Sequence, residues 1–261
     1  MGQPLIELQG VGRRFTSDGG AHVACQNISV SVERGEFLAV VGPSGCGKST
    51  LLNMIAGLLP PSAGTVLYDG RPVTDVNLKV GYVTQRDNLL PWANVENNVG
   101  LALDIKHIRG KERQRRVQEH LALVGLEAFA HYYPAQLSGG MRKRAALART
   151  LIYEPETILM DEPFGALDAQ LKLVLQHELM KIWERLRHTI IFVTHDLPEA
   201  VTLADRVVVM SGSPGTIRLT QPIDLGRPRD AFSIRFTERF RELHQRLWDS
   251  LGEHARQGSA A

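Results

Sequence analysis

A glycine-rich segment, Gly42–Thr50 (GPSGCGKST), constrains the fold of this chain more than any other feature, because it fits the pattern GxxxxGK[ST]. A continuous apolar run, Phe37–Val41, comes directly before it and predicts a strand that is buried on both faces. A stretch of helical composition, Lys48–Leu58, follows. A phosphate-binding loop needs this order of strand, turn and helix. The segment therefore predicts an α/β protein that binds a nucleoside phosphate.

The residue types in this segment suit the binding of phosphate. Its glycines let backbone N–H groups turn inward toward the β-phosphate, and the following helix adds its positive N-terminal end. Lys48 places a cation near the β- and γ-phosphate oxygens, and Ser49 offers a hydroxyl to Mg²⁺. The alternative is a glycine-rich turn without a ligand. We expect nucleotide contacts from Gly42, Pro43, Ser44, Gly45, Cys46, Gly47, Lys48, Ser49 and Thr50.

Polar side chains suited to hydrolysis follow other predicted strands. The further buried strands are expected at Thr157–Met160, Thr189–Val193 and Arg206–Met210. Asp161 suits the Mg²⁺ shell, and Glu162 suits a general base or an orienting group for the attacking water. His195 lies at a carboxyl strand end, where open α/β sheets bind ligands, and is expected to contact the γ-phosphate. Gln85 ends GYVTQ in the same manner, and its amide can meet both Mg²⁺ and water. For each of these residues the plainer alternative is a polar residue where a strand meets solvent.

A second glycine-rich segment, Leu137–Met141 (LSGGM), also predicts the start of a helix. Ser138 is a natural N-cap for a helix through RKRAALARTLIY. Gly139 and Gly140 keep that start bare, so that a phosphate can approach its N–H groups. A helix cap alone would leave two glycines unexplained at positions where they are costly.

The remaining patterns predict the architecture around these segments. Alternation in Ile28–Glu33 indicates a strand with one solvated face, and Asp69-Gly70 indicates a hairpin. Apolar residues at helical spacing predict a helix over Leu171–Leu186, with Leu171, Val174, Leu175, Leu179, Ile182 and Leu186 on one face. Buried strands that alternate with such helices favour a parallel sheet. We therefore expect an α/β fold: a P-loop NTPase core with a mostly parallel sheet, an N-terminal antiparallel β subdomain and a helical insertion.

One domain is expected over residues 1–261. Its core would cover about 1–96 and 157–225, and a helical subdomain would cover about 97–156, where we find no comparable apolar run. A helical tail is expected at about 230–252 and would pack Phe236, Phe240, Leu243 and Leu247, which are spaced by four, three and four residues.

Composition, charge and cysteine pattern argue against a nucleic-acid-binding, a disulfide-rich or a membrane-spanning protein. Hydrophobic residues make up 43% of the chain and charged residues 22%, and the net charge of +2 gives no reason to expect a nucleic-acid partner. Cys25 and Cys46 form no CxxC pattern, which fits a reducing compartment. No secretory signal or run of about 20 apolar residues is found, so any role at a membrane is expected to be peripheral, on the cytoplasmic side.

Together these motifs resemble the ATP-binding cassette (ABC) ATPases, over about residues 4–225. The resemblance implies that Phe15 stacks on adenine, although family members more often have Tyr; the alternative is a buried core Phe. It implies that two copies bind head to tail, so that Ser138 and Gly140 of one copy meet the ATP on Lys48 of the other. Ala166-Leu167-Asp168 resembles the loop by which the two subunits touch.

The fifth residue of the LSGG segment is usually Gln in the family and is Met141 here. LSGGMRKR resembles LSGGMRQR of the importer subgroup for nitrate, sulfonates and taurine. This resemblance implies transmembrane permease subunits as partners and, indirectly, an extracytoplasmic substrate-binding protein. Leu89, Leu90 and Trp92 would receive a short helix of the permease, although a local core is the alternative.

Three other functions stay open at this point. An exporter ATPase is hard to separate from an importer by sequence. A non-transport ABC ATPase that acts on DNA or ribosomes usually carries long coiled-coil insertions or two cassettes. A lone P-loop kinase or GTPase would leave LSGGM unexplained. We also expect thiol alkylation of Cys46 to inhibit the protein and ATP to protect it.

Overall fold

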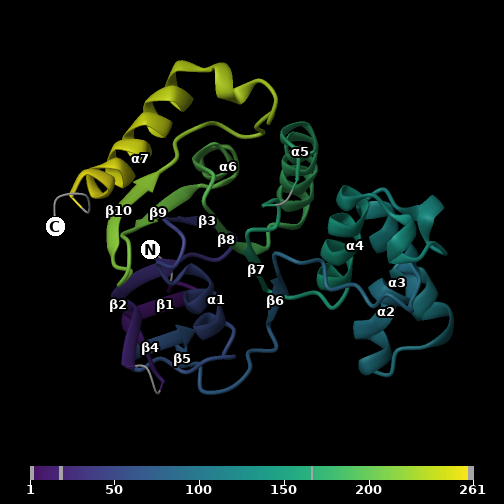
Figure 1. Ribbon diagram of the computed structural model, residues 1–261. Helices are drawn as coiled ribbons and strands as arrows, with labels where there is room; N and C mark the ends of the chain where they lie inside the picture. The colour runs from purple at the N-terminus through teal and green to yellow at the C-terminus, as the bar shows by residue number, and fades with distance from the viewer. Residues whose placement is uncertain (1–2, 18–19, 166, 258–261) are drawn as a thin grey trace.

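The computed structural model describes residues 3–17, 20–165 and 167–257, and it contains two sheets surrounded by helices (Figure 1). The strands are β1 (Ile6–Ser17), β2 (Gly20–Val32), β3 (Phe37–Val41), β4 (Ala63–Tyr68), β5 (Arg71–Pro72), β6 (Val80–Val83), β7 (Thr157–Asp161), β8 (Thr189–Thr194), β9 (Arg206–Met210) and β10 (Ile217–Pro222). The α-helices are α1 (Lys48–Ile55), α2 (Val95–Ile105), α3 (Gly110–Leu123), α4 (Gly139–Leu151), α5 (Ala169–Leu186), α6 (Leu197–Leu203) and α7 (Glu238–Gln257). Single 3₁₀ turns lie at Glu127–Phe129, Pro134–Gln136 and Ile234–Phe236.

The larger sheet has the order β10-β9-β3-β8-β7-β6 and is parallel except for β10, which confirms the predicted mostly parallel sheet. Every residue of β3 and β8 is buried, as their unbroken apolar runs predict. Val41 is paired with Thr194, and Asp161 with Val193. This register places the carboxyl ends of β3, β7 and β8 at one edge of the sheet, so the loops that follow these strands begin side by side.

The smaller sheet has the order β2-β1-β4-β5 and is antiparallel, as expected for the N-terminal strands. The predicted hairpin joins β4 to β5, with positive φ angles of 51° at Asp69 and 72° at Gly70. Helix α1 contacts strands of both sheets, and its side chains Leu52 and Ile55 are buried between them. Because the phosphate loop ends at the start of α1, the packing of this helix against both sheets fixes its direction relative to the loop.

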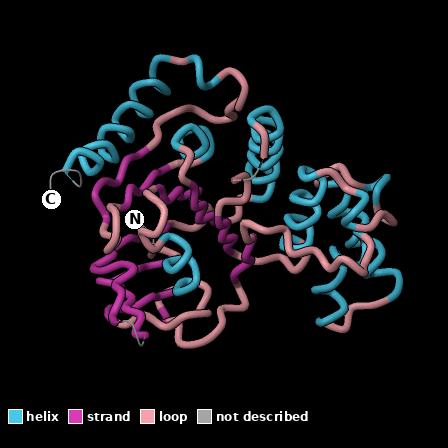
Figure 2. The backbone as a smooth tube through the Cα atoms, viewed as in Figure 1, coloured by secondary structure: helices cyan, strands magenta, loops and turns pink. Residues whose placement is uncertain are grey.

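Helices α2, α3 and α4 lie beside the sheet, beyond β6 and β7, whereas α5, α6 and α7 cover one face of it (Figure 1, Figure 2). Between residues 95 and 156 the structure contains helices and turns and no strand, as expected from the sequence. The division of the chain into core and helical subdomain, with the boundaries given above, stays a prediction. Within the described ranges, no helix is long and apolar enough to cross a membrane.

The predicted apolar face of α5 is partly wrong. Val174 and Leu186 are 43% and 38% exposed, whereas Leu175, Leu179 and Trp183 are buried. The buried stripe is rotated toward Trp183 because its ring packs edge-on against Phe37 of the sheet.

The prediction for the tail is also wrong at one residue. Phe236 is 83% exposed and lies before α7, whereas Phe240, Leu243 and Leu247 are buried as expected. Thr237 has an extended ψ of 148°, and its hydroxyl accepts a hydrogen bond from the Phe240 N–H at 3.3 Å. The helix therefore starts after Phe236, and its spacing to Phe240 is not helical.

Candidate nucleotide-binding and hydrolysis site

The phosphate loop connects the end of β3 to the start of α1. Gly47 precedes the helix in the left-handed region, with φ of 89°, and no side chain caps the helix start. A Cβ at Gly47 would lie 2.8 Å from the carbonyl oxygen of Ala24, so only glycine fits between the loop and β2. The N-terminal N–H groups of α1 therefore carry no side-chain cap, which suits the binding of an anion.

Lys48 lies under the loop and is 6% exposed. Its ammonium group donates to the carbonyl oxygens of Gly42 at 2.8 Å and Pro43 at 2.9 Å. These two bonds compensate the buried cation and hold it at the loop. Phosphate oxygens that enter the loop would be further acceptors for the same ammonium group.

Cys46 is fully buried next to this lysine, with its sulfur 3.9 Å from the Lys48 ammonium nitrogen. Burial raises the pKa of the Cys46 thiol, and the positive charge of Lys48 opposes this rise. The thiolate, which is the form that reacts with alkylating agents, is therefore scarce at neutral pH.

Asp161 ends β7 and faces the same loop. Burial raises the pKa of Asp161, a hydrogen bond from the Ser49 side chain lowers it, and the neighbouring Glu162 raises it further. The bond joins the hydroxyl and the carboxylate that the sequence predicts as Mg²⁺ ligands. Two oxygen ligands next to a phosphate loop fit Mg²⁺, which proteins usually hold through one or two carboxylates together with substrate phosphates.

Glu162 and His195 form a pair at the adjoining strand ends. The imidazole Nδ1 lies 3.1 Å from the Glu162 carboxylate oxygen. Glu162 has a positive φ of 46°, and its N–H donates to the carbonyl oxygen of Val193 at 2.9 Å, which fixes this unusual backbone conformation. A Cβ built on Gly165 would lie 3.4 Å from Gln85 Nε2 and 3.5 Å from the Glu162 carboxylate, so these two side chains also converge.

A pocket of about 620 Å³ opens where these groups meet. Its lining includes Pro43, Ser44, Glu162 and His195, which the sequence singles out. Other lining residues, which were not predicted as part of the site, are Met210, Ser211, Gly212, Arg218, Ser250 and Leu251. The last two come from α7, about 200 residues from the phosphate loop in the chain, and no motif marks them.

The LSGG segment begins α4, as predicted, but it lies outside this pocket. The Ser138 hydroxyl accepts a hydrogen bond from the Met141 N–H at 3.3 Å, which confirms Ser138 as the N-cap. A Cβ on Gly140 would lie 2.8 Å from the side chain of Leu171, whereas one on Gly139 would meet nothing closer than 3.5 Å. Two helices, α1 and α4, thus begin beside glycines, and they lie on different parts of the molecule (Figure 1).

Comparisons with known proteins agree with this arrangement. The family model described as ABC transporter matches residues 25–165. An uncharacterized ABC transporter ATP-binding protein of Methanocaldococcus jannaschii is 46% identical, over 94% of this chain and 92% of its own length. This chain belongs to the ABC transporter ATPase family.

Two other relatives and one solved structure extend this result. The nitrate import ATP-binding protein NrtD of Synechococcus elongatus is 43% identical, over 95% of this chain and 91% of its own length. The aliphatic sulfonates import ATP-binding protein SsuB of Bacillus cereus is 41% identical, over 89% of this chain and 92% of its own length. The dimeric ATP-binding cassette MJ0796 bound to ADP and Pi has a TM-score of 0.74 and 32% identity, over 85% of this chain and all of that one. The protein is thus an ATP-binding and ATP-hydrolysing cassette.

Phe15, the aromatic residue expected to stack on adenine in an ABC ATPase, lies on β1 and is 39% exposed. The alternative of a buried core phenylalanine is therefore wrong. The Arg13 guanidinium carbon lies 4.9 Å from the centre of its ring, so a cation already packs on this residue. Stacking of Phe15 on adenine stays a prediction.

Two loops of this ABC ATPase have structural roles that the sequence did not show. In the segment expected to touch a second copy, Ala166 lies outside the described residues, and Asp168 caps α5 by accepting from the Leu171 N–H at 2.9 Å.

In the loop after Gln85, Leu89 is 8% exposed and belongs to the core, so the prediction that it receives a partner helix is wrong. Trp92 of the same loop is 75% exposed.

Proposed function

We propose that the protein is the ATPase subunit of a membrane importer for a small anion, such as nitrate, an alkanesulfonate or taurine. The observation that carries the proposal is the 43% and 41% identity to nitrate and aliphatic sulfonates import ATP-binding proteins, over at least 89% of this chain. The subunit would act at the cytoplasmic face of the membrane, attached through permease subunits. The cargo would be held by the permease and its extracytoplasmic binding protein.

In the proposed site, the nucleotide occupies the phosphate loop. Lys48 and the N–H groups of α1 bind its phosphates, and Phe15 stacks on the adenine. Ser49, Asp161 and Gln85 hold Mg²⁺, which when bound neutralises charge on the phosphate oxygens. Support comes from the hydrogen bond between Ser49 and Asp161.

In the proposed hydrolysis step, Glu162 orients the attacking water and accepts its proton. His195 holds the Glu162 carboxylate, 3.1 Å away, and contacts the γ-phosphate through its imidazole. Gln85 reaches the same point from the loop after β6 and orients the water through its amide. Support comes from the convergence of these three side chains beside the phosphate loop.

The proposed working state is a head-to-tail dimer, in which Ser138, Gly139 and Gly140 of one copy meet the ATP of the other. The LSGG helix start lies outside the pocket of its own chain, and the similar MJ0796 cassette is described as dimeric. Because the γ-phosphate would contact both copies, ATP binds the closed dimer more tightly than the open one, and hydrolysis releases the dimer.

The permease is proposed to dock beside the loop that follows Gln85. Trp92 is 75% exposed there, and the nearby Tyr132 and Tyr133 are 42% and 48% exposed. The loop and these tyrosines are neighbours, because the Val95 N–H donates to the Tyr132 carbonyl at 2.9 Å. Exposed aromatic rings gathered at one place are typical of a protein interface.

Uptake of labelled nitrate, taurine and an alkanesulfonate would test the proposal, in cells that lack this chain and in cells that carry it again. We expect uptake of one of these anions to be lost and to return with the wild-type chain but not with Glu162→Gln. Normal uptake of all three anions without the chain would contradict anion import. Loss of solute export instead would identify an exporter.

A further inference from the structure

The turn that carries His195 is held by side chains on both sides of it in the chain. The Thr194 hydroxyl accepts a hydrogen bond from the Asp196 N–H at 3.0 Å and donates one to the Glu199 carboxylate at 2.7 Å. The Asp196 carboxylate accepts from the Glu199 N–H at 3.1 Å and so caps α6. These three bonds fix the backbone between β8 and α6, where His195 lies.

Glu199 is buried, which is unusual for a carboxylate, and it is only 2% exposed. Burial raises the pKa of Glu199, and the hydrogen bond from Thr194 opposes this rise. Its second carboxylate oxygen is buried too and makes no hydrogen bond to any residue that the structure describes. A buried charged oxygen without compensation is destabilising, so this atom requires a cation nearby.

Lys172 of α5 supplies this cation. Its ammonium nitrogen lies 3.5 Å from the second Glu199 oxygen and 3.6 Å from the Asp196 carboxylate. The Lys172 side chain is 18% exposed, so water and salt screen these contacts less than those of a surface ion pair. We call Lys172, Asp196 and Glu199 the histidine support, because the three residues join the turn of His195 to another helix.

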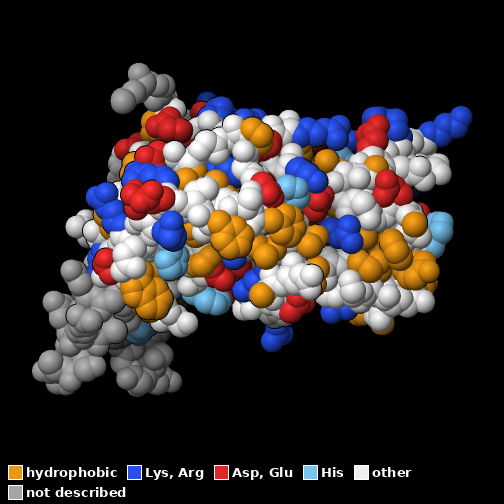
Figure 3. Space-filling view, turned by 90° about the horizontal axis from the view of Figure 1, so that it is seen from above, with side chains coloured by type: hydrophobic (Ala, Val, Ile, Leu, Met, Phe, Trp, Pro, Cys, Tyr) orange, Lys and Arg blue, Asp and Glu red, His pale blue; other side chains and the backbone are white. Residues whose placement is uncertain are grey.

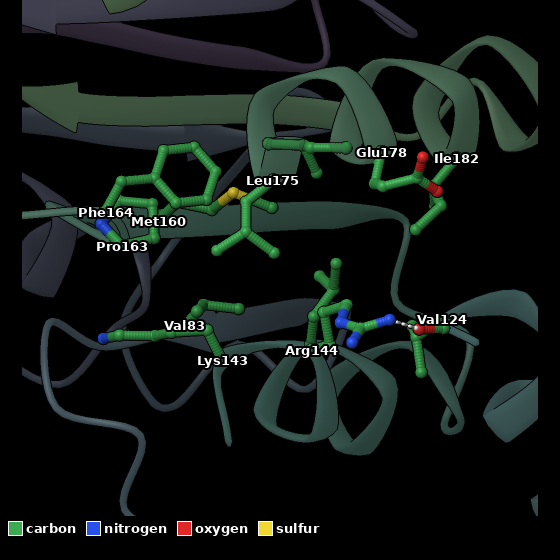
Figure 4. Close-up of a pocket in the computed structure, with 12 residues that line it drawn as sticks. Val83, Val124, Lys143, Arg144, Met160, Pro163, Phe164, Leu175, Glu178 and Ile182 are labelled. Atoms are coloured by element: carbon green, nitrogen blue, oxygen red, sulfur yellow. Dashed lines mark hydrogen bonds between the residues drawn. The ribbon is translucent and has the colours of Figure 1, made fainter. Parts of the chain in front are cut away.

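The helix from which Lys172 extends is itself firmly packed. Leu175 and Leu179, which follow on α5, are buried in the larger hydrophobic core. Figure 4 shows Leu175 beside Met160 and Phe164, at an apolar pocket between α5 and α4. Closely packed side chains resist displacement, so the sheet and the core set the position from which Lys172 reaches the turn.

We propose that Lys172 and Glu199 are positioning residues for ATP hydrolysis, which hold His195 where its imidazole meets the Glu162 carboxylate. The inference rests on the proposed function, in which His195 and Glu162 act together on the γ-phosphate and the attacking water. The His195 side chain is 54% exposed, so its own packing does not fix the ring, and the turn beneath it has to. The pocket at the phosphate loop is lined by neither positioning residue among those that the structure describes, so both act through His195.

Removal of the Lys172 charge should release the turn. One buried oxygen of Glu199 would then lack compensation, so the carboxylate has to turn toward water or take up a proton. Either change weakens the bond between Glu199 and Thr194, and the imidazole of His195 then spends less time against Glu162. The phosphate loop is unchanged, so the rate of hydrolysis should fall while ATP binding is retained.

Two further variants control for charge and for folding. Lys181 lies on the same helix, pairs with Glu178 at 3.2 Å and has a 59% exposed side chain, so Lys181→Met removes an equal charge and leaves the histidine support intact. The double variant Lys172→Met/Glu199→Gln removes both charges of the buried pair. It therefore contains no uncompensated Glu199 carboxylate and should fold, yet it still lacks the link from α5 to the turn.

The test measures kcat and KM for ATP in the wild type, these two variants, Lys172→Met and Lys172→Arg. We expect kcat to fall roughly 10- to 100-fold in Lys172→Met and in the double variant, because a displacement of about 1 Å at a catalytic group can cost about 10²-fold. KM should change by less than about threefold. Lys172→Arg, which keeps the charge, should recover most of the turnover, and Lys181→Met should equal the wild type. An unchanged kcat in Lys172→Met, or an equal fall in Lys181→Met, would overturn the inference.

NMR of the histidine side chains gives a second measurement, which does not require hydrolysis. The resonance of His195 is assigned by its loss in His195→Gln. We expect it to shift in Lys172→Met and to stay in place in Lys181→Met, and an unshifted resonance in Lys172→Met would also overturn the inference. Full ATP turnover in His195→Gln would instead contradict the proposed role of His195 in hydrolysis, and the NMR comparison would still decide whether Lys172 places the ring.

Discussion

The starts of α1 and α4 are two versions of one local structure, a helix that follows a glycine-rich turn. At α1, Gly47 leaves the first N–H groups without a side-chain cap, and Lys48, Asp161 and Glu162 of the same chain lie around them. At α4, the Ser138 hydroxyl caps the helix. The nearby Arg142 guanidinium donates to the carboxylate of Asp87, in the loop after Gln85.

The difference shows what a phosphate site needs beyond its motif. Both starts have the N–H groups and the positive end of the helix dipole. Only α1 also lies where parallel strands end, so the register of the sheet brings carboxylates and a histidine to it. The start of α4 lies beside the sheet and, in our proposal, becomes a phosphate contact when a second copy supplies the nucleotide (Figure 1).

The largest expected effect tests whether the α1 site contains the catalytic group. Glu162→Gln should retain ATP binding and lower hydrolysis by about 10²–10⁴-fold, because the amide cannot accept the proton of water. The ATP-bound dimer should then accumulate, which size-exclusion chromatography would detect. Glu178→Gln, on the exposed side of α5 where Glu178 pairs with Lys181, is the control and should behave as the wild type. Wild-type turnover in Glu162→Gln would remove Glu162 from the mechanism.

A smaller effect is expected when the cation at α1 is removed. Lys48→Met deletes the ammonium group that lies under the phosphate loop, and it should weaken ATP binding by about 10- to 100-fold, since a hydrogen bond to a charged group contributes about 1.5–3 kcal/mol. Calorimetric titration with ATP would measure this, with Lys181→Met on the exposed face of α5 as the control. Equal affinity in Lys48→Met and the control would place the nucleotide elsewhere.

At α4, two substitutions of Ser138 separate helix capping from phosphate binding. Ser138→Ala removes the cap and should lower the free energy of unfolding by about 1 kcal/mol, whereas Ser138→Asp keeps a good cap. Both should reduce hydrolysis by roughly 10-fold, because one lacks the hydroxyl and the other repels phosphate. Thermal unfolding and ATP turnover would be measured on the same samples. Full turnover in the stable Ser138→Asp protein would leave Ser138 as a cap alone.

Mixing variants tests whether the two helix starts meet across a dimer. Ser138→Asp retains an intact α1 site, and Lys48→Met retains an intact α4 start, so a mixed dimer contains one unaltered composite site. An equimolar mixture should therefore recover part of the turnover that each variant lacks alone. Absence of any recovery, with mixed dimers demonstrated by pull-down, would contradict the head-to-tail arrangement.

The smallest effect concerns Cys46. Because this thiol is buried, we now expect its alkylation, and the inhibition that follows from it, to be slow. Burial raises its thiol pKa, so the thiolate fraction, and with it the rate of alkylation, should stay low at pH 7 and increase only at a more alkaline pH than for a free thiol. Mass spectrometry should find native Cys46 modified far more slowly than the unfolded chain. Cys25, also buried with a raised pKa, is the internal comparison. Equal rates in native and unfolded protein would show that the loop opens freely.

On the surface formed by α5 and the segment that leads into α7, the spacing of apolar residues did not predict which side chains are buried. Hydrophobic side chains there lie among Lys, Arg, Asp and Glu on one face (Figure 3). Phe236 and Val174 satisfied a helical spacing in the sequence, yet they are 83% and 43% exposed. Spacing fixes which residues share a face only once the helix start is known, and the neighbours that cover this face come from distant parts of the chain.

The sequence by itself determined the phosphate loop, the buried strands, the hairpin at Asp69 and the cap at Ser138. Each depends on residues close together in the chain, where backbone geometry, glycine conformations and local hydrogen bonds decide the outcome. Tertiary structure alone decided the pairing of Glu162 with His195, the α7 wall of the pocket and the attachment of the Gln85 loop to α4. These contacts join residues that are far apart in sequence, and only the register of the sheet and the packing of the helices bring them within hydrogen-bond distance.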